Sequence, residues 1–275
     1  MNFVQQPMQQ EFSDSPDRPF AAASLAIEVI GREGSVALMN GRDVIAARSL
    51  DSGARAAAGL APQIASLAKE FLPGGALDAL AGISVAVGPG SFTGLRIAVT
   101  TAKTLAYALQ IPVVAVNSLT AIAALVRPDL AAPDHATAVR QQVLVGLSAY
   151  RGQVYRGWFS VEGAPEIDLI SADQWKSELN RSIQDNENAA ESCDDRPQES
   201  PEKNVILMGD RSVFDRTKLA FAPQQWRGDG EIWAVGVGRI GAEMLRRGET
   251  TSAIDLVPDY LRPSAAEEKA SGTIG

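Results

Sequence analysis

The chain has 275 residues, of which 45% are hydrophobic and 21% charged, a composition typical of a globular protein with a buried core. Its formal net charge of -8 argues against binding nucleic acid alone, because phosphate contacts need an excess of Lys and Arg. Its one cysteine, Cys193, excludes an internal disulfide, and its one histidine, His135, excludes metal sites built on two or more histidines.

Targeting signals and common catalytic motifs are also missing from the sequence. No apolar run is long enough to span a bilayer, and the N-terminus lacks the basic and apolar regions of a secretory signal. A Ser-His-Asp triad would have to use His135, and no GxSxG elbow accompanies it. We therefore expect a cytoplasmic protein without membrane contact, metal or cofactor, and we interpret His135 as a loop histidine.

The first elements predicted along the chain form an antiparallel meander. Residues 1–22 are rich in Gln, Pro, Ser and Asp and predict a disordered tail. Strands follow at about 24–30, 34–39 and 43–50. Asn40-Gly41 lies between the last two strands and is a strong hairpin signal, because both residue types tolerate positive φ.

Helices and strands alternate after this meander. Apolar residues spaced three and four apart predict helices near 54–71 and 93–109, and NSLTAIAALVR, with Asn117 or Ser118 as its cap, predicts a third. The runs AGISVAV and IPVVAV lie between these helices and predict buried strands. The order β-β-β-α-β-α-β-α favours a mixed α/β sheet with helices on both faces.

A Pro-rich break, RPDLAAPDHA, separates this half from a second one. There we predict a hairpin around Arg151-Gly152, a short helix in SADQWKSEL, a strand in NVILMGD and a helix in EIWAVGVGRIGAEMLRRG. The predicted organisation is a first lobe at 23–128, a second, smaller α/β lobe at 129–265 with a disordered acidic insertion at 181–203, and a frayed tail at 266–275.

The loop GPGSFTGLR, between the strand near 81–87 and the helix near 93–109, suggests a phosphate cradle. It fails the Walker pattern, and its GxGxxxG spacing is one residue longer than the dinucleotide fingerprint. A helix N-terminus with capping hydroxyls still suits an anion, whereas the bland alternative is a tight turn from strand to helix. The motif leaves both readings open. The candidate loop residues are Gly88, Gly90, Ser91, Thr93, Gly94 and Arg96.

The same loop resembles the signature of the TsaB (YeaZ) family, relatives of the tRNA-modifying enzyme TsaD. LAIEVIGREGSVAL, VLVGLSAYRGQVYRGWF and PDYLRPSAAEEK resemble further family segments in the expected order. The resemblance covers about 24–270, apart from the acidic insertion. It implies an actin-like, ribonuclease-H-like fold of two lobes with mixed sheets.

The resemblance also implies a function. Family members take part in forming N6-threonylcarbamoyladenosine on tRNAs that read codons starting with A. TsaD transfers the threonylcarbamoyl group, TsaB is its dimerisation partner and activator without doing the chemistry, and the small ATPase TsaE binds the pair. The implied partners are a TsaD homologue in a heterodimer, TsaE, and tRNA through the complex only. A homodimer is one possible form of the isolated chain, and the sequence does not decide whether it self-associates.

Departures from enzymatic relatives argue against catalysis by this chain. Actin-like ATPases place a carboxylate at the end of the first strand of each lobe, where this chain has Glu28 and Ser148. A serine hydroxyl is neutral and a poor ligand for a cation. TsaD also needs an HxxxH metal motif, which one histidine cannot supply. An independent actin-like ATP-binding enzyme is the alternative function, and a protease is a weaker one.

A dimerisation partner needs an exposed helical surface, and the family pairs through the first-lobe helices. We therefore predict a partner interface on the helices near 54–71 and 93–109. Its candidate residues are Leu60, Ile64, Leu67, Ile97, Thr101 and Ala108. The alternative is that these positions are simply buried against the sheet, as an α/β fold already requires.

Overall fold

The computed structural model describes residues 23–31, 34–50, 56–131, 141–160, 163–191, 205–220, 226–228 and 231–261. The predicted tails at 1–22 and 266–275 lie outside these ranges, as do His135, Cys193 and residues 192–203 of the predicted insertion.

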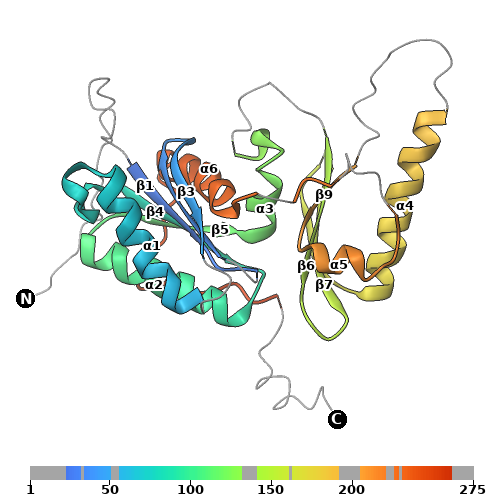
Figure 1. Ribbon diagram of the computed structural model, residues 1–275, viewed down its shortest axis with the longest axis horizontal. Helices are drawn as coiled ribbons and strands as arrows, with labels where there is room; N and C mark the ends of the chain where they lie inside the picture. The colour runs from blue at the N-terminus through green and yellow to red at the C-terminus, as the bar shows by residue number, and fades with distance from the viewer. Residues whose placement is uncertain are drawn as a thin grey trace, which may run out of the picture.

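Two sheets, each with its own helices, form two lobes side by side (Figure 1). The first sheet has the order β3-β2-β1-β4-β5 and the second β8-β7-β6-β9. The strands are β1 (Ala23–Glu28), β2 (Ser35–Asn40), β3 (Asp43–Ser49), β4 (Gly82–Gly88), β5 (Val113–Asn117), β6 (Gln142–Ser148), β7 (Gln153–Phe159), β8 (Glu166–Ser171) and β9 (Val205–Gly209).

Helices cover both faces of the first sheet and the outer face of the second (Figure 1). The helices are α1 (Ala56–Phe71), α2 (Phe92–Leu109), α3 (Ser118–Ala123), α4 (Ala172–Glu191), α5 (Arg211–Asp215) and α6 (Trp233–Arg246), with the 3-10 turns η1 (Pro73–Gly75), η2 (Leu77–Ala79) and η3 (Pro128–Leu130).

The predicted β-β-β-α-β-α-β-α order of the first lobe is confirmed. β1 pairs antiparallel with β2 and parallel with β4, and β4 pairs parallel with β5. Along β1 the side chains alternate: Leu25 and Ile27 face α1 and α2, whereas Ala26 faces α3 and α6. This mixed sheet, followed by a second mixed sheet, is the actin-like arrangement that the resemblance implied.

The turn between β2 and β3 is displaced by one residue from the predicted Asn40-Gly41 turn. Asn40 still pairs with Asp43, so the two turn residues are Gly41 and Arg42. Gly41 has a φ of 56°, a conformation that glycine adopts without the steric penalty of a Cβ.

Helix α6 differs from the predicted domain organisation. Its residues fall within 129–265, yet it packs on β1, β2, β4 and β5 and contributes Ala234 and Val237 to the core of the first lobe. The chain thus enters the second lobe after α3 and returns to the first at α6. Sequence order alone could not show this return, because a helix at the end of the chain can cover either sheet.

Helix α4 corrects the predicted insertion, because residues 181–191 are helical instead of disordered. Ser171 and Gln174 form a capping box at its start: Ser171 Oγ accepts from the Gln174 N–H at 3.2 Å, and Gln174 Oε1 accepts from the Ser171 N–H at 2.9 Å. Strand β8, just before the helix, was not predicted.

A continuous apolar core joins the two lobes. It contains side chains of β1, β2, β5, α3 and α6 from the first lobe and of β6, β7 and β9 from the second. Arg127, only 4% exposed, fixes the start of the connecting segment through two hydrogen bonds to Asp129 and further ones to the carbonyls of Gln141 and Ser160. The interlobe joint is therefore packed and hydrogen-bonded.

Candidate functional site

The glycine loop between β4 and α2 begins with a close approach of two backbone segments. Gly88 has a φ of 141°, and a Cβ there would lie 2.1 Å from the carbonyl oxygen of Asp259. The Asp259 N–H in turn donates to the carbonyl of Val87 at 2.7 Å. Gly88 is thus needed where the C-terminal segment crosses the end of β4.

The next glycines face the end of β1. A Cβ on Gly90 would lie 2.8 Å from the Cβ of Ile30, and one on Gly94 would lie 1.9 Å from the carbonyl oxygen of Val29. The Ser91 N–H donates to the Ile30 carbonyl at 3.0 Å, and Ser91 Oγ caps α2 by accepting from the Gly94 N–H at 3.3 Å. These contacts seat the loop and the first turn of α2 directly on the chain after β1.

All three glycines therefore approach the protein itself. Among the candidate loop residues, only Ser91 lines the cleft between the lobes. Thr93 is exposed, and Arg96 turns to the C-terminal segment. The glycine spacing is thus accounted for by the packing of protein backbone, the simpler of the two readings of the sequence.

Residues 250–261, which we call the C-terminal strap, run along α2. Arg96 Nε donates to the Tyr260 hydroxyl at 3.1 Å, and the Arg96 guanidinium lies 4.0 Å from the centre of the Phe92 ring. The Phe92 and Tyr260 rings are 4.8 Å apart, and Lys103 Nζ donates to strap carbonyls of Ile254 and Leu256. The strap, which includes residues 258–261 of the PDYLR segment, therefore packs on the helix that opens in GPGSFTGLR.

The first strand-end carboxylate, Glu28, is 2% exposed and is held by the protein. Ser35 Oγ and the Ile30 N–H donate to its two oxygens, and Ser35 Oγ accepts from the Ala234 N–H at the start of α6. Burial raises the pKa of Glu28 from 4.5 to about 7, although the hydrogen bonds from Ser35 and Ile30 act in the opposite direction. This carboxyl joins β1, β2 and α6 and does not line the cleft.

The second strand-end position, Ser148, lies at the interlobe cleft. The lining residues are Ile30, Gly31 and Ser91 from the first lobe and Leu147, Ser148, Tyr150, Asp210, Ser212 and Arg216 from the second. The carboxylate of this lining that the structure describes, Asp210, accepts the N–H of Ser212 and caps α5. No group of three or more His, Cys, Asp or Glu side chains that could hold a metal occurs among the described residues.

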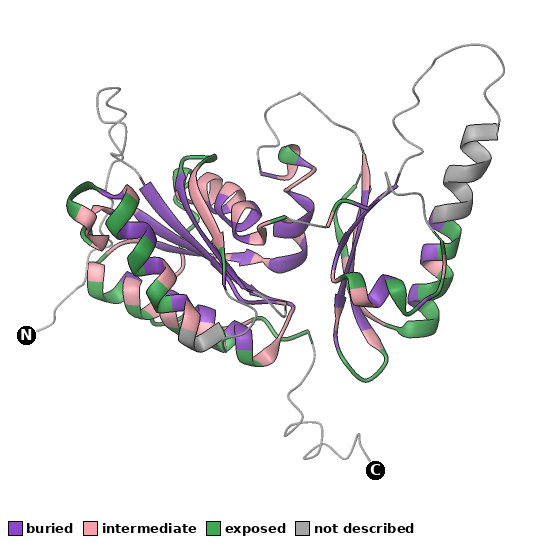
Figure 2. Cartoon of the chain, viewed as in Figure 1, coloured by how far each residue is buried: buried purple, intermediate pink, exposed green. Residues whose placement is uncertain are grey.

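The predicted partner face needs a correction. Leu60, Ile64 and Leu67 are at most 3% exposed and form part of the first-lobe core, so they cannot contact a partner. The apolar stripe of α1 faces the sheet, and the other side of the helix is exposed (Figure 2). The exposed residues between 59 and 71 are mostly small or charged. On α2, Ile97 and Thr101 are half-buried and Ala108 is exposed.

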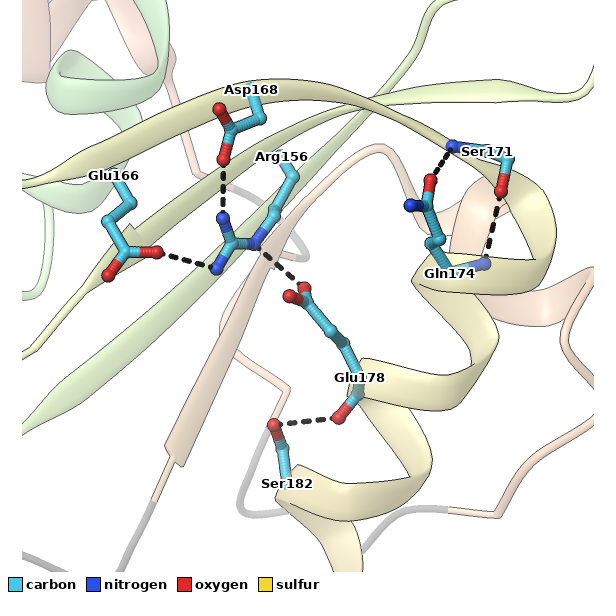
Figure 3. Close-up of polar contacts among 7 residues, drawn as sticks. All are labelled: Arg156, Glu166, Asp168, Ser171, Gln174, Glu178 and Ser182. Atoms are coloured by element: carbon cyan, nitrogen blue, oxygen red, sulfur yellow. Dashed lines mark hydrogen bonds and ion pairs between the residues drawn. The ribbon is translucent and has the colours of Figure 1, made fainter.

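Sequence reasoning missed a charge cluster in the second lobe (Figure 3). Arg156 on β7 pairs with Glu166 at 3.0 Å and Asp168 at 2.7 Å from β8, and with Glu178 at 2.8 Å from α4. Burial alone would lower the pKa of Arg156, but the hydrogen bond to Glu166 and the charges of the three carboxylates raise it. The cluster ties α4 and β8 to β7. An arginine within the apolar strand QVYRGWF was the available signal.

A membrane-spanning segment is also absent from the described ranges, where no helix combines the length and the apolar character that a bilayer crossing needs.

Comparisons with known proteins agree with the motifs. The family model TsaD, tRNA N6-adenosine threonylcarbamoyltransferase, matches residues 49–177. The tRNA threonylcarbamoyladenosine biosynthesis protein TsaB of Bacillus subtilis (strain 168) is 31% identical over 201 residues, which cover 69% of this chain and 73% of that protein.

Two solved structures from Pseudomonas aeruginosa share the fold. One is a protein with similarity to peptidase YeaZ, with a TM-score of 0.62 at 23% identity, covering 88% of this chain and all of that one. The other is YeaZ, with a TM-score of 0.61 at 21% identity, covering 87% of this chain and 99% of that one. The sequence match to the Bacillus protein, together with this fold, shows that the chain belongs to the TsaB (YeaZ) family.

Proposed function

We propose that this chain is a non-catalytic scaffold subunit that pairs with a TsaD homologue and activates it in forming N6-threonylcarbamoyladenosine on tRNAs that read codons starting with A. The observation that carries the proposal is family membership, at 31% identity to a TsaB protein. In this scheme a TsaE ATPase binds the pair and tRNA is held by the complex. The net charge of -8 is consistent with RNA binding by the partner.

The strand-end positions support a non-catalytic role. Metal-assisted phosphoryl transfer needs carboxylates that reach a cation at the nucleotide phosphates. Glu28 is buried and hydrogen-bonded to Ser35 and Ile30, and Ser148 carries no charge. These features weigh against the alternative, an independent actin-like ATP-binding enzyme.

We place the partner surface on the outward face of α2. Ile97, Thr101 and Ala108 lie on one face of the helix, because they are four and seven residues apart. The strap occupies the neighbouring side through Arg96 and Lys103. The small side chains of Thr101 and Ala108 would let a partner helix approach closely at these two positions.

Co-expression with the TsaD homologue tests the proposal. We expect size-exclusion chromatography with light scattering to give a discrete complex. Threonylcarbamoylation of tRNA, with TsaE, ATP, threonine, bicarbonate and the carbamoyl-adenylate synthase present, should require this chain. Equal modification in its absence would contradict a scaffold role.

A matched pair of variants tests the surface. Ala108→Arg places a long charged side chain on the exposed face of α2 and should abolish the complex without unfolding the chain. Ser177→Arg makes a comparable change on the exposed side of α4 and should leave the complex intact. Loss of the complex in both variants, or in neither, would place the partner elsewhere.

A further inference from the structure

Among the described residues, the interlobe cleft is lined by one positive and one negative side chain, and these two do not form an ion pair with each other. Arg216 and Asp210 both line it, at opposite ends of the short helix α5. Arg216 Nη2 donates to Ser212 Oγ at 3.3 Å, and Asp210 accepts the Ser212 N–H at 2.9 Å. The two charged groups thus flank Ser212, and no ion pair joins them among the described residues.

The rest of the lining is neutral and well supplied with hydroxyl groups. Ser91 comes from the first lobe and Ser148 and Ser212 from the second, and Ile30 and Leu147 provide apolar surface. The cleft has a cavity volume of about 40 Å³. This is room for about three water molecules, at roughly 10–15 Å³ each, and therefore for the charged head of a small molecule, with the remainder outside the cleft.

The turn between β6 and β7 forms part of the rim of the cleft. Tyr150, Arg151 and Gly152 all have left-handed backbone there, with φ of 59°, 47° and 73°. Positive φ is the usual geometry of a tight hairpin turn, so the hairpin accounts for this conformation. The turn leaves Tyr150 65% exposed beside the cleft.

We propose that the interlobe cleft binds a small zwitterion of the α-amino acid class. Arg216 binds the carboxylate of the ligand, Asp210 accepts from its ammonium group, and the serine hydroxyls complete the hydrogen bonds. Arg216 has five N–H donors, so the bond to Ser212 leaves donors for a carboxylate. Asp210 uses one oxygen for the cap of α5 and keeps the other for an ammonium.

The charge balance favours a zwitterion over a nucleotide. Among the described lining residues, a triphosphate would meet one cation and one carboxylate, and the carboxylate would repel it. A zwitterion matches both charges at once. The inference is independent of the scaffold role, because the cleft and the outward face of α2 share none of the residues named for either site.

The test uses titration calorimetry and amide NMR on the full chain. The probes are glycine, serine and leucine, with N-acetylglycine and glycinamide as analogues that lack one charge, and inorganic phosphate and ATP as competing chemistries. We expect at least one amino acid to bind with a dissociation constant of about 1 mM or tighter, and both blocked analogues to bind far more weakly.

Variants assign the two charges. Arg216→Gln and Asp210→Asn should each weaken amino-acid binding by about ten- to a hundredfold, the usual effect of losing a hydrogen bond to a charged group. Asn caps a helix as well as Asp, so Asp210→Asn keeps α5 intact. Arg211→Gln, which removes an exposed charge on the same helix paired with Asp215, is the control and should bind like the parent chain.

Three results would overturn the proposal. The first is that the parent chain binds no amino acid, and the second is that neither variant weakens the binding. The third is that phosphate or ATP binds, with an affinity that Arg216→Gln lowers and Asp210→Asn leaves unchanged. None of these results bears on complex formation with the TsaD homologue, so the two proposals fail separately.

Discussion

Replacing Glu28 by Gln should change how the stability of the fold depends on pH. The carboxyl is 2% exposed, and burial raises its pKa from 4.5 to about 7. A group whose pKa is raised by folding stabilises the fold fully below its unfolded pKa, and this contribution is lost as the pH rises through the folded value. The stability of the parent chain should therefore fall between pH 4.5 and about 7.

The size of the effect follows from the same values. A rise in pKa from 4.5 to about 7 corresponds to about 3 kcal/mol, at about 1.4 kcal/mol for each tenfold change in proton affinity. In a chain of this size, that is a loss of roughly 6–12 °C in melting temperature. Glu28→Gln carries no charge at any pH and should lack this loss.

The assay is denaturant unfolding of both chains between about pH 5 and 8. This window lies above the pH range in which Glu243 titrates. The hydrogen bond from Arg246 lowers the pKa of Glu243 to about 2, so its effect on stability falls between pH 2 and 4.5. Glu70→Gln, on the exposed side of α1, is the control and should follow the parent chain. Parallel curves for the parent chain and Glu28→Gln would refute the reasoning.

Two further predictions concern packing and charge. Gly94→Ala should destabilise the chain by about 3 kcal/mol or more, because the added Cβ would lie 1.9 Å from the Val29 carbonyl oxygen. Gly59→Ala in α1 is the control and should be neutral or stabilising, since no atom lies closer than 3.9 Å to its Cβ. Thermal melts compare the two variants, and equal melting temperatures would contradict the contact between Gly94 and the Val29 backbone. Arg156→Met should lower the free energy of unfolding by about 1–3 kcal/mol, because it leaves three carboxylates without their cation. Arg48→Met removes an exposed ion pair and should lower it by less than about 1 kcal/mol. Denaturant midpoints compare the two variants, and equal losses would show that the cluster stabilises the fold no more than a surface ion pair does.

Local periodicity predicted the element order of the first lobe but could not assign the faces of its helices. The spacing of Leu60, Ile64 and Leu67 correctly indicated an amphipathic α1. The same stripe serves equally for packing on a sheet or on a partner, and the structure buries it against the sheet. The outward face of α1 carries mainly small and charged residues, so the apolar stripe marks the side that packs on the sheet.

Composition misled the prediction for residues 181–191. The run is polar and acidic, which predicts disorder because it cannot bury apolar surface. It contains neither Pro nor Gly, and the Ser171–Gln174 capping box starts the helix ahead of it. Helix propensity and capping act locally and need no apolar side chain, so α4 extends as far as Glu191.

The glycine loop explains why its sequence could not decide between phosphate and protein. A missing Cβ serves any close approach to the backbone, whether the approaching oxygen belongs to a phosphate or to a carbonyl. Here the oxygens belong to Val29 and Asp259, on segments far from the loop in sequence. Arg96 and Tyr260, 164 residues apart, close the same arrangement. The loop and the strap, whose sequences resemble separate family segments, therefore form one structural unit, in which the loop orients α2 and the strap covers one side of it. A mutation in either segment should alter the surface that α2 offers to a partner, without any nucleotide at the loop.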